Sequence, residues 1–244
     1  MSIHTKAIIL AMLAAGPASA LADISFYAGF GAGGSRLEED LNITLTAFDY
    51  QGPPGQEVLT PIASSSLDKF KGTDVGYRVF AGVKFWRFLG IEAGYVSLGE
   101  PDESLGVIIP PDAPLRPEIA AALKLTDEID GIEAYAVGYL PFSDKWEAFA
   151  KLGVIDWDST FKTRNAFSDV YPPSPPPSQG GQNQIPTVTP PSSTVDTDGT
   201  DLAGGIGLNY KAAEHMTIRG EGTWYDIENT ELAWLLNFSL IYDF

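Results

Sequence analysis

The sequence predicts an all-β protein, namely an eight-stranded antiparallel up-and-down transmembrane β-barrel with three long extracellular loops. Three observations lead to this prediction. Apolar residues alternate with small or polar residues in eight segments, and a period of two residues is typical of strands. Long and short connections between the segments follow one another, as they do in membrane barrels, whose two ends differ in loop length. The chain also begins with an export signal and ends on an aromatic strand.

The first 22 residues have the order of a secretory signal peptide. A basic start at residues 1–6 precedes an apolar stretch at 7–16 and then the small residues around Ala20 and Ala22. We expect cleavage after Ala22, with Ala20 as the alternative site. About ten apolar residues are too few for a membrane-spanning helix, which needs about 20. Residues 23–244 are therefore expected to form the outer-membrane domain of an exported chain.

The first half of this domain holds four expected strands. In the first, Phe26 and Phe30 share a face with alanines, and glycines occupy the other face. The second sets Val79 and its apolar neighbours against Arg78, and the third sets Ile91 against Glu92. The fourth alternates less clearly. These strands are expected at residues 24–37, 73–85, 90–99 and 126–140.

The second half holds the other four strands. Lys151 alternates with apolar residues in the fifth strand, and Arg219 and Glu221 do so in the seventh. The last strand has a fully apolar face made of every second residue from Trp234 to Phe244, which suits a strand that faces lipid. These strands are expected at residues 146–161, 201–210, 216–227 and 232–244.

The connections divide into two kinds. Turns of a few residues are expected at one end of the barrel, and three polar segments rich in glycine and proline are expected to form long loops at the other end. The second loop is predicted to contain a short helix from Pro117 to Leu123. The third contains proline runs that cannot build a core. The three loops are expected at residues 38–71, 100–125 and 162–199.

A soluble, lipocalin-like barrel is the competing fold, because alternation alone does not say which face lies inside. Three features favour the membrane barrel. The predicted inner face is rich in glycine, as a narrow lumen requires. Aromatic residues lie near the strand ends on the apolar face, and the chain ends on Phe244.

Charged residues on the predicted inner face are expected to pair within the lumen, because an isolated buried charge costs several kcal/mol. They could form a gated pore or a proton path, but an eight-stranded lumen is narrow enough for side chains to fill it, so we expect a structural network. Glu147 is placed nearer the rim, and the facing of Glu133 is left open. The predicted network comprises Arg78, Lys84, Glu92, Lys151, Arg219 and Glu221.

The chain resembles the OmpA-like family of eight-stranded outer-membrane barrels. The resemblance rests on Phe26–Gly33, Gly76–Phe85, Gly90–Tyr95, Gly138–Pro141, Lys151–Gly153 and the terminal Phe244. It implies a location in the outer membrane with lipid around the barrel, and a lumen filled by a charge network. It also implies that Phe244 is the signal read by the outer-membrane assembly machinery. The peptidoglycan-binding domain of some relatives is not expected here.

Composition narrows the chemistry. The net charge of −17 comes from 32 acidic and 15 basic residues, which argues against nucleic acid as a partner. The chain has no cysteine, and the domain has one histidine, His215, in a predicted periplasmic turn, so no catalytic residues and no enzyme activity are expected. Asp196–Asp201 resembles part of a calcium loop, but Gly207 stands where the distal glutamate belongs. No metal and no cofactor are expected.

Two functions remain from the sequence. The first is a structural role in envelope integrity, performed by a monomeric barrel with a filled lumen. The alternative is a surface adhesin or binding protein that acts through its long acidic and proline-rich loops, because loops on a rigid scaffold commonly carry binding. The surface ligand of such an adhesin is unknown.

Overall fold

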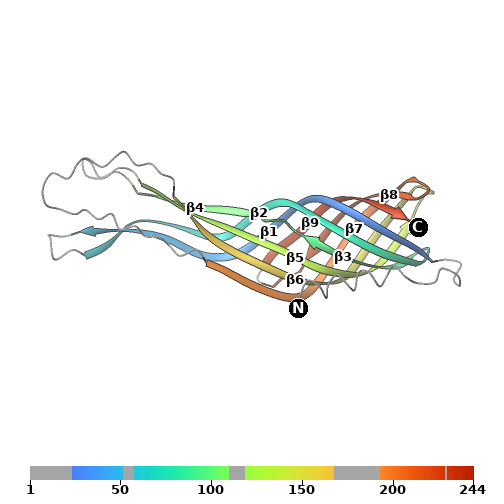
Figure 1. Cartoon of the computed structure of the whole chain (residues 1–244), viewed down its shortest axis with the longest axis horizontal. Coiled ribbons are helices and arrows are strands. Elements are labelled where there is room, and N and C mark those ends of the chain that lie inside the picture. Colours follow the sequence, from blue (N-terminus) through green and yellow to red (C-terminus); the bar gives the residue numbers. More distant parts are fainter. Residues whose placement is uncertain (1–23, 52–57, 110–118, 168–192, 229) are drawn as a thin grey trace.

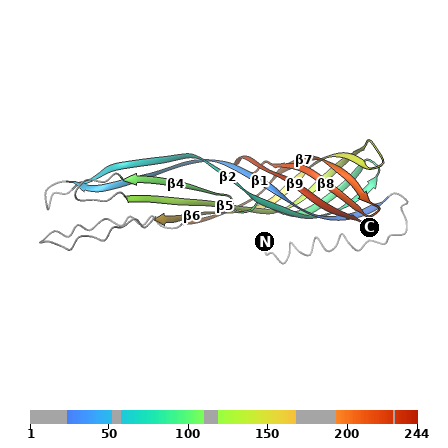
Figure 2. The same cartoon turned by 90° about the horizontal axis from the view of Figure 1, so that it is seen from above.

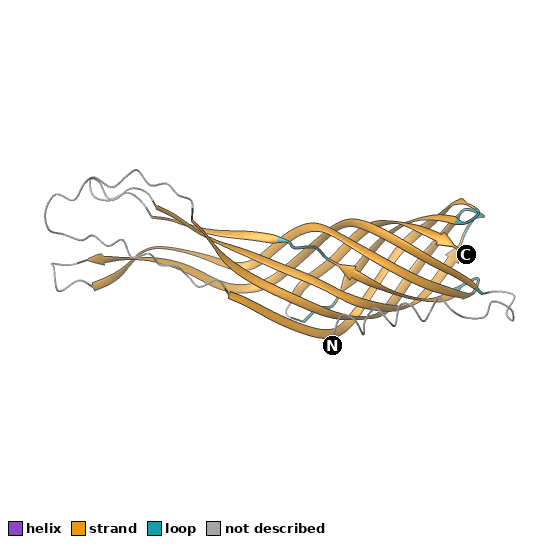
Figure 3. Ribbon diagram, viewed as in Figure 1, coloured by secondary structure: helices purple, strands orange, loops and turns teal. Residues whose placement is uncertain are grey.

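Almost every residue that the computed structural model describes lies in a β-strand (Figures 1 and 3). The described residues are 24–51, 58–109, 119–167, 193–228 and 230–244, so the predicted signal peptide lies outside them. No helix within these ranges is long and apolar enough to cross a membrane. They form nine strands, which are β1 (Ser25–Gln51), β2 (Val58–Trp86), β3 (Leu89–Ser97), β4 (Asp102–Ile109), β5 (Ile119–Pro141), β6 (Trp146–Phe167), β7 (Ser193–Ala213), β8 (Met216–Tyr225) and β9 (Thr230–Asp243).

The strands form one antiparallel sheet that closes on itself. Its order is β3-β2-β1-β9-β8-β7-β6-β5-β4, and an additional pairing of β3 with β5 completes the barrel. β3 pairs with one half of β5 and β4 pairs with the other half. The two short strands therefore occupy a single position in the barrel wall, one after the other along β5. The barrel therefore has eight strand positions, and the predicted fold class is confirmed.

A short interruption separates β3 from β4 at residues 98–101. Gly99 has a φ of 82°, a left-handed conformation that favours glycine. A Cβ at this position would lie 2.6 Å from Oδ2 of Asp74 and 2.8 Å from the carbonyl oxygen of Val75. The segment stays attached to β5, because the Leu98 amide donates to the Ile129 carbonyl at 2.9 Å. Glycine thus permits the bend without opening the wall.

One end of the barrel carries short turns. Two residues join β2 to β3, four join β5 to β6, and two join β7 to β8. The C-terminus lies at this same end (Figure 1). These turns occur where the sequence predicts them.

The described parts of the ranges predicted as long loops are almost entirely strands, so that prediction was wrong there. Over residues 38–71, β1 and β2 continue as one hairpin, from Glu38 opposite Lys71 to Gln51 opposite Val58. Over residues 100–125, β4 pairs with β5. Within residues 162–199, β6 and β7 stay paired up to Thr163 opposite Ser193. The remaining parts of these ranges, including the proline runs, lie outside the described residues.

The helix predicted from Pro117 to Leu123 is also wrong. β5 begins at Ile119, and Ala120 and Leu123 lie opposite Ile108 and Leu105 of β4. Local helix propensity of alanine and leucine loses here to a ladder of backbone hydrogen bonds with a neighbouring strand.

The apolar face of the barrel points outward, as the membrane prediction requires. Phe238 is 72% exposed, whereas the adjacent Asn237 is fully buried in the lumen. Leu236, Leu240 and Tyr242 are likewise more than half exposed. A soluble barrel would bury this row, so the arrangement excludes the lipocalin-like alternative and leaves lipid as the surroundings.

Beyond the barrel the strands continue into a long β-structured projection, which we call the extension (Figures 1 and 2). The extension comprises residues 38–51, 58–71, 102–109, 119–128, 159–167 and 193–201. Apolar side chains fill its interior. This extension core contains the buried residues Phe70, Leu105, Leu123 and Leu125 and the partly buried residues Leu41, Ile43, Leu67 and Phe161.

Candidate functional site

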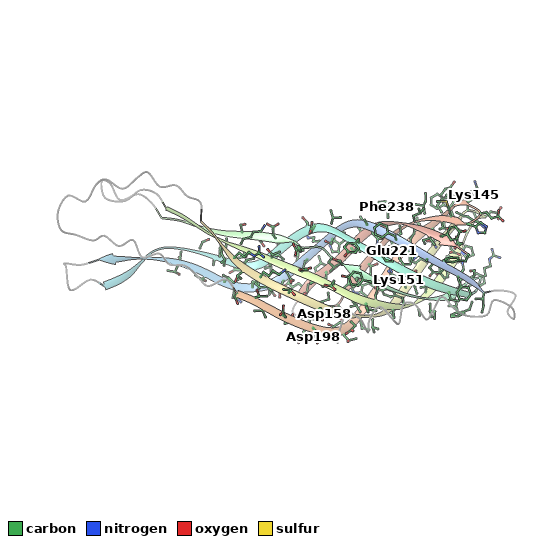
Figure 4. All side chains as sticks on the ribbon, in the orientation of Figure 1. Lys145, Lys151, Asp158, Asp198, Glu221 and Phe238 are labelled. Carbon is green, nitrogen blue, oxygen red and sulfur yellow. The ribbon has the colours of Figure 1, made fainter. Side chains whose placement is uncertain are left out.

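Six charged side chains meet inside the barrel. They come from β2, β3, β5, β6 and β8, and each is at most 3% exposed. Figure 4 shows Lys151 and Glu221 between the strands of the wall. This charge cluster consists of Arg78, Glu92, Glu133, Lys151, Arg219 and Glu221. The strand period places all of them inward, because side chains alternate between the two faces and their neighbours, apolar residues or glycines, face outward.

Arg78 is the centre of the charge cluster. Its Nε donates to Oε1 of Glu133 at 2.8 Å, and its Nη2 donates to Oε1 of Glu92 at 2.8 Å. Its Nη1 donates to Oε1 of Glu221. One guanidinium therefore joins three carboxylates from three strands, a geometry for which its planar fork of donors is suited.

Arg219 and Lys151 complete the positive charge. Arg219 Nη1 donates to Oε2 of Glu92 at 2.5 Å, and its Nε donates to Oδ1 of Asn209 at 2.9 Å. Lys151 Nζ donates to Oε1 of Glu221 at 3.0 Å. The three cations also lie over aromatic rings of the lumen, at 4.3–4.4 Å from the nearest ring centroids, which are those of Phe80, Phe149 and Tyr135.

Tyrosine hydroxyls add hydrogen bonds to Glu92 and Glu133, whereas the buried Oε2 of Glu221 has no hydrogen-bond partner among the described residues and lies 3.7 Å from Nη1 of Arg219. Tyr27 donates to Oε2 of Glu92 at 2.9 Å. Tyr135 and Tyr225 donate to Oε2 of Glu133 at 2.8 and 3.2 Å. The charge cluster thus combines three anions with three cations and sums to zero, which offsets the cost of removing these groups from water.

The structure brings five of the six predicted network residues into one cluster. Glu133, whose facing the sequence leaves open, points inward and binds Arg78. Glu133 is two residues from Tyr135 on β5, so the two side chains lie on the same face of the strand. This spacing is the feature of the sequence that relates the direction of Glu133 to that of Tyr135.

Lys84, the sixth predicted residue, lies apart from the cluster at the mouth of the barrel beside the short turns. Its Nζ donates to Oε2 of Glu147 at 2.5 Å, and the two side chains are 24% and 18% exposed. They border a cavity of about 330 Å³ that opens at the short turns and is also lined by Tyr27, Tyr139 and Arg219. Of the charge cluster, Arg219 lines this cavity.

An apolar layer closes the lumen on the other side of the charge cluster. Its members lie on β1, β3, β5, β6 and β9 and in the interruption that follows β3, farther toward the extension than the charge cluster, and all are at most 3% exposed. The layer consists of Leu37, Val96, Leu98, Ile129, Ile155, Trp157 and Leu235. Side chains therefore fill the lumen from the charge cluster upward, as expected for eight strands.

A family model described as the outer membrane protein beta-barrel domain matches residues 8–244. The chain belongs to the outer-membrane β-barrel protein family. The eight strand positions agree with the OmpA-like members that the sequence resembles, and that resemblance is confirmed. The protein is accordingly an outer-membrane protein whose apolar face meets membrane lipid. No curated protein matches the sequence.

Solved structures of several outer-membrane proteins share the fold. Ail of Yersinia pestis is 13% identical, with 91% of this chain and 99% of that chain covered and a TM-score of 0.42. Neisserial surface protein A is 13% identical, with 90% and 97% covered and a TM-score of 0.45. OmpT of Escherichia coli, an outer-membrane protease, is 10% identical, with 90% and 97% covered and a TM-score of 0.40. At these values the likeness carries no functional argument.

The other candidate residues lie at the two ends of the barrel. His215 is exposed in the β7–β8 turn, where its Nδ1 lies 2.9 Å from the Asp243 carbonyl oxygen. The Phe244 amide donates to the Phe26 carbonyl oxygen at 3.0 Å, so the last residue closes β9 onto β1. The calcium-like Asp196–Asp201 segment is part of β7 rather than the end of a loop. Within the described ranges, no three histidine or acidic side chains have a metal-binding arrangement.

A pair of carboxyl groups lies at the base of the extension, which the sequence did not single out. Burial raises the pKa of Glu39 to about 7, and the nearby Asp127 adds to the rise. Burial also raises the pKa of Asp127, although Ser159 Oγ donates to its Oδ1 at 2.7 Å. The pair joins β1 to β5 and β6 at the point where the apolar layer gives way to the extension core.

Proposed function

We propose that this protein is a non-conducting structural barrel that contributes to the integrity of the outer membrane. The closed lumen is the observation that supports the proposal. A charge cluster with no net charge and an apolar layer follow each other along the barrel axis. An ion would have to disrupt several buried ion pairs and then enter a layer made mostly of apolar side chains, at a cost of several kcal/mol for each unpaired charge.

We infer the route to the membrane from the same features. Residues 1–22 direct export and are removed, and the assembly machinery recognises the terminal strand that ends at Phe244. The closed barrel has no free edge within its lipid-facing part, so a monomer satisfies its own backbone there. The ring nitrogen Nδ1 of the exposed His215 lies against the backbone carbonyl of Asp243, and we propose a role without enzyme activity.

Conductance in planar lipid bilayers tests the closed lumen. We expect the purified protein to give no stepwise current, as heat-denatured protein gives none. Reproducible steps that scale with the amount of inserted protein would contradict the proposal. The cellular role is tested in a strain that lacks the protein. We expect this strain to leak a periplasmic enzyme, and we expect restored expression of the protein to stop the leakage.

The extension favours a second function, that of a surface-binding protein. The extension core gives this projection a defined shape outside the membrane, and its outer faces carry carboxylates on several strands. A barrel that served only to fill the membrane would not need an ordered projection of this length. Rigid β-structure lowers the entropy lost when a partner binds, which suits a binding surface.

A shortened variant separates the two functions. Residues 41–68 and 161–195 would each be replaced by a two-residue turn, because Asp40 lies opposite Lys69 and Thr160 lies opposite Asp196. If the barrel alone supports the envelope, this variant fully reverses the leakage of the strain that lacks the protein. If the extension binds a partner, the variant loses attachment to host or neighbouring cells while its heat-modifiable gel mobility is unchanged.

A further inference from the structure

The hairpin of β8 and β9 is shorter than the strands beside it. β8 ends at Tyr225 and β9 begins at Thr230, whereas β7 continues for ten residues beyond its last pair with β8, Ala203 opposite Tyr225 (Figure 1). Over residues 193–201, β7 pairs with β6 on one side, and no described strand pairs with the other side. We call this side the β7 edge.

Two hydrogen bonds show which backbone groups the β7 edge presents. The Leu202 carbonyl accepts from the Asp226 amide at 2.9 Å, so residue 202 points away from β6. The Ser193 amide donates to Thr163 Oγ1 at 3.1 Å, so residue 193 points toward β6. In an antiparallel strand both backbone groups of a residue point to one side, and the sides alternate. Thr194, Asp196, Asp198 and Thr200 therefore direct their amides and carbonyls to the β7 edge.

The β7 edge is open to solvent and acidic. Residues 193–198 and 200 are exposed. The four edge residues share the parity of Leu202, which is 55% exposed on the outer face, so their side chains point to that face. The register places Asp198 opposite Asp158 of β6, and Figure 4 shows the two side by side. Thr200 Oγ1 donates to Oδ1 of Asp156, which also lies on β6, at 3.2 Å. The Asp156 carboxylate is therefore within reach of the β7 edge as well.

The charges determine which strand can pair with this edge. A second copy of β7 would bring aspartates against aspartates, and like charges directly opposite destabilise a strand pair. Acidic residues thus protect the edge against self-association, as edge charges commonly do. A cationic strand would gain both the unused backbone hydrogen bonds and favourable pairs with Asp196 and Asp198.

We propose that the β7 edge is a docking site for an extended cationic peptide segment, which adds to the extension as a further strand. The backbone groups of residues 194, 196, 198 and 200 provide the affinity, and the two aspartates select lysine or arginine on the outer face of the added strand. This inference rests on the proposed surface-binding function and names the chemical class of its partner.

A synthetic peptide tests the proposal with the full-length protein in nanodiscs of zwitterionic lipid. The probe is a fluorescent eight-residue peptide of alternating lysine and valine with blocked ends, and empty discs provide the blank. We expect saturable binding that weakens as salt rises, and no binding of the peptide in which glutamate replaces lysine. The double variant D196N/D198N should bind about three- to tenfold more weakly, given the modest strength of exposed charge pairs.

A proline variant tests the backbone contribution separately. Thr200→Pro removes an amide that faces the edge and keeps the pairing with β6, so we expect about tenfold weaker binding. Thr200→Val is the matched control, because it removes the same hydroxyl and keeps the amide; it should bind as the parent does. Equal affinity of the proline and valine variants, equal binding of the glutamate peptide, or no binding by the parent would overturn the docking site. The shortened variant tests surface binding in cells independently of this peptide.

Discussion

The barrel and the extension are built from the same strands but have opposite interiors. In the barrel, β5 turns Glu133 and Tyr135 inward and Leu140 outward. In the extension, the same strand turns Leu123 and Leu125 inward and carries Lys124 and Glu128 on the other face. The strand period is unchanged along β5. The assignment of polar and apolar residues to its two faces is reversed.

The reversal follows from what surrounds each region. Lipid cannot hydrogen-bond with the barrel surface, so apolar residues face outward and polar groups must find partners in the lumen. Water surrounds the extension, so apolar residues gain by facing inward and charges remain solvated. A change in the solvent along one strand thus accounts for both interiors, and each prediction below perturbs one region and spares the other.

Removing the central cation of the lumen should have the largest effect. Arg78→Met leaves three buried carboxylates with two cations, and we expect a loss of about 3–5 kcal/mol in the free energy of unfolding. Arg36→Met is the matched change at the base of the extension, where Arg36 pairs with Glu38 near the surface, and it should cost less than about 1 kcal/mol. Urea unfolding in lipid, followed by gel mobility, measures both. Equal losses would contradict the distinction between the two regions.

Truncating the extension core should destabilise the extension and spare the barrel. Leu125 is fully buried, so Leu125→Ala is expected to cost about 2–5 kcal/mol within the extension. Brief proteolysis of protein in nanodiscs should then cut the extension faster, while the heat-modifiable mobility of the barrel is unchanged. If cleavage stays at the parental rate, Leu125 does not lie in a packed core.

Outward lysines should distinguish lipid from water. Phe238→Lys near the middle of β9 should cost about 2–4 kcal/mol in a bilayer. The control is Asn42→Lys on an exposed position of β1 in the extension, which should change stability by less than about 0.5 kcal/mol. Refolding into lipid vesicles provides the measurement. A neutral effect at Phe238 would mean that the barrel faces are reversed.

The carboxyl pair at the base of the extension should give a smaller, pH-dependent effect. Because the pKa of Glu39 is raised to about 7 in the folded protein, its contribution is complete below the unfolded pKa of about 4.3 and is lost as pH rises to about 7. The raised pKa of Asp127 acts in the same direction. We expect the extension to be more resistant to protease at pH 5 than at pH 8, with cleavage rates normalised to an unstructured peptide. Glu39→Gln should remove much of this difference, and an unchanged difference would assign it to other groups.

Most of the barrel follows from the sequence, because the alternation of apolar residues with small or polar residues predicts each spanning segment. The extension was not predicted, because a membrane strand is recognised by apolar residues that face outward. Leu41 and Ile43 alternate with polar residues, but their apolar side chains face inward. Neighbouring glycine and proline residues also favoured a loop. The hydrogen-bond partners within the charge cluster could not be predicted from neighbouring residues in the sequence. Tyr225 and Glu133 are separated by 92 positions in the chain, and only the closure of the barrel brings them together.

Amide hydrogen exchange of the full-length protein in nanodiscs tests the reversed interiors most directly. Residues 38–44 and 123–128 would be compared with β8 in the barrel and with the turn at residues 142–145. An extension with a packed core and paired strands predicts slow exchange in both extension segments, approaching that of β8. Exchange as fast as in the turn, with β8 still protected, would contradict a folded extension and with it the central claim.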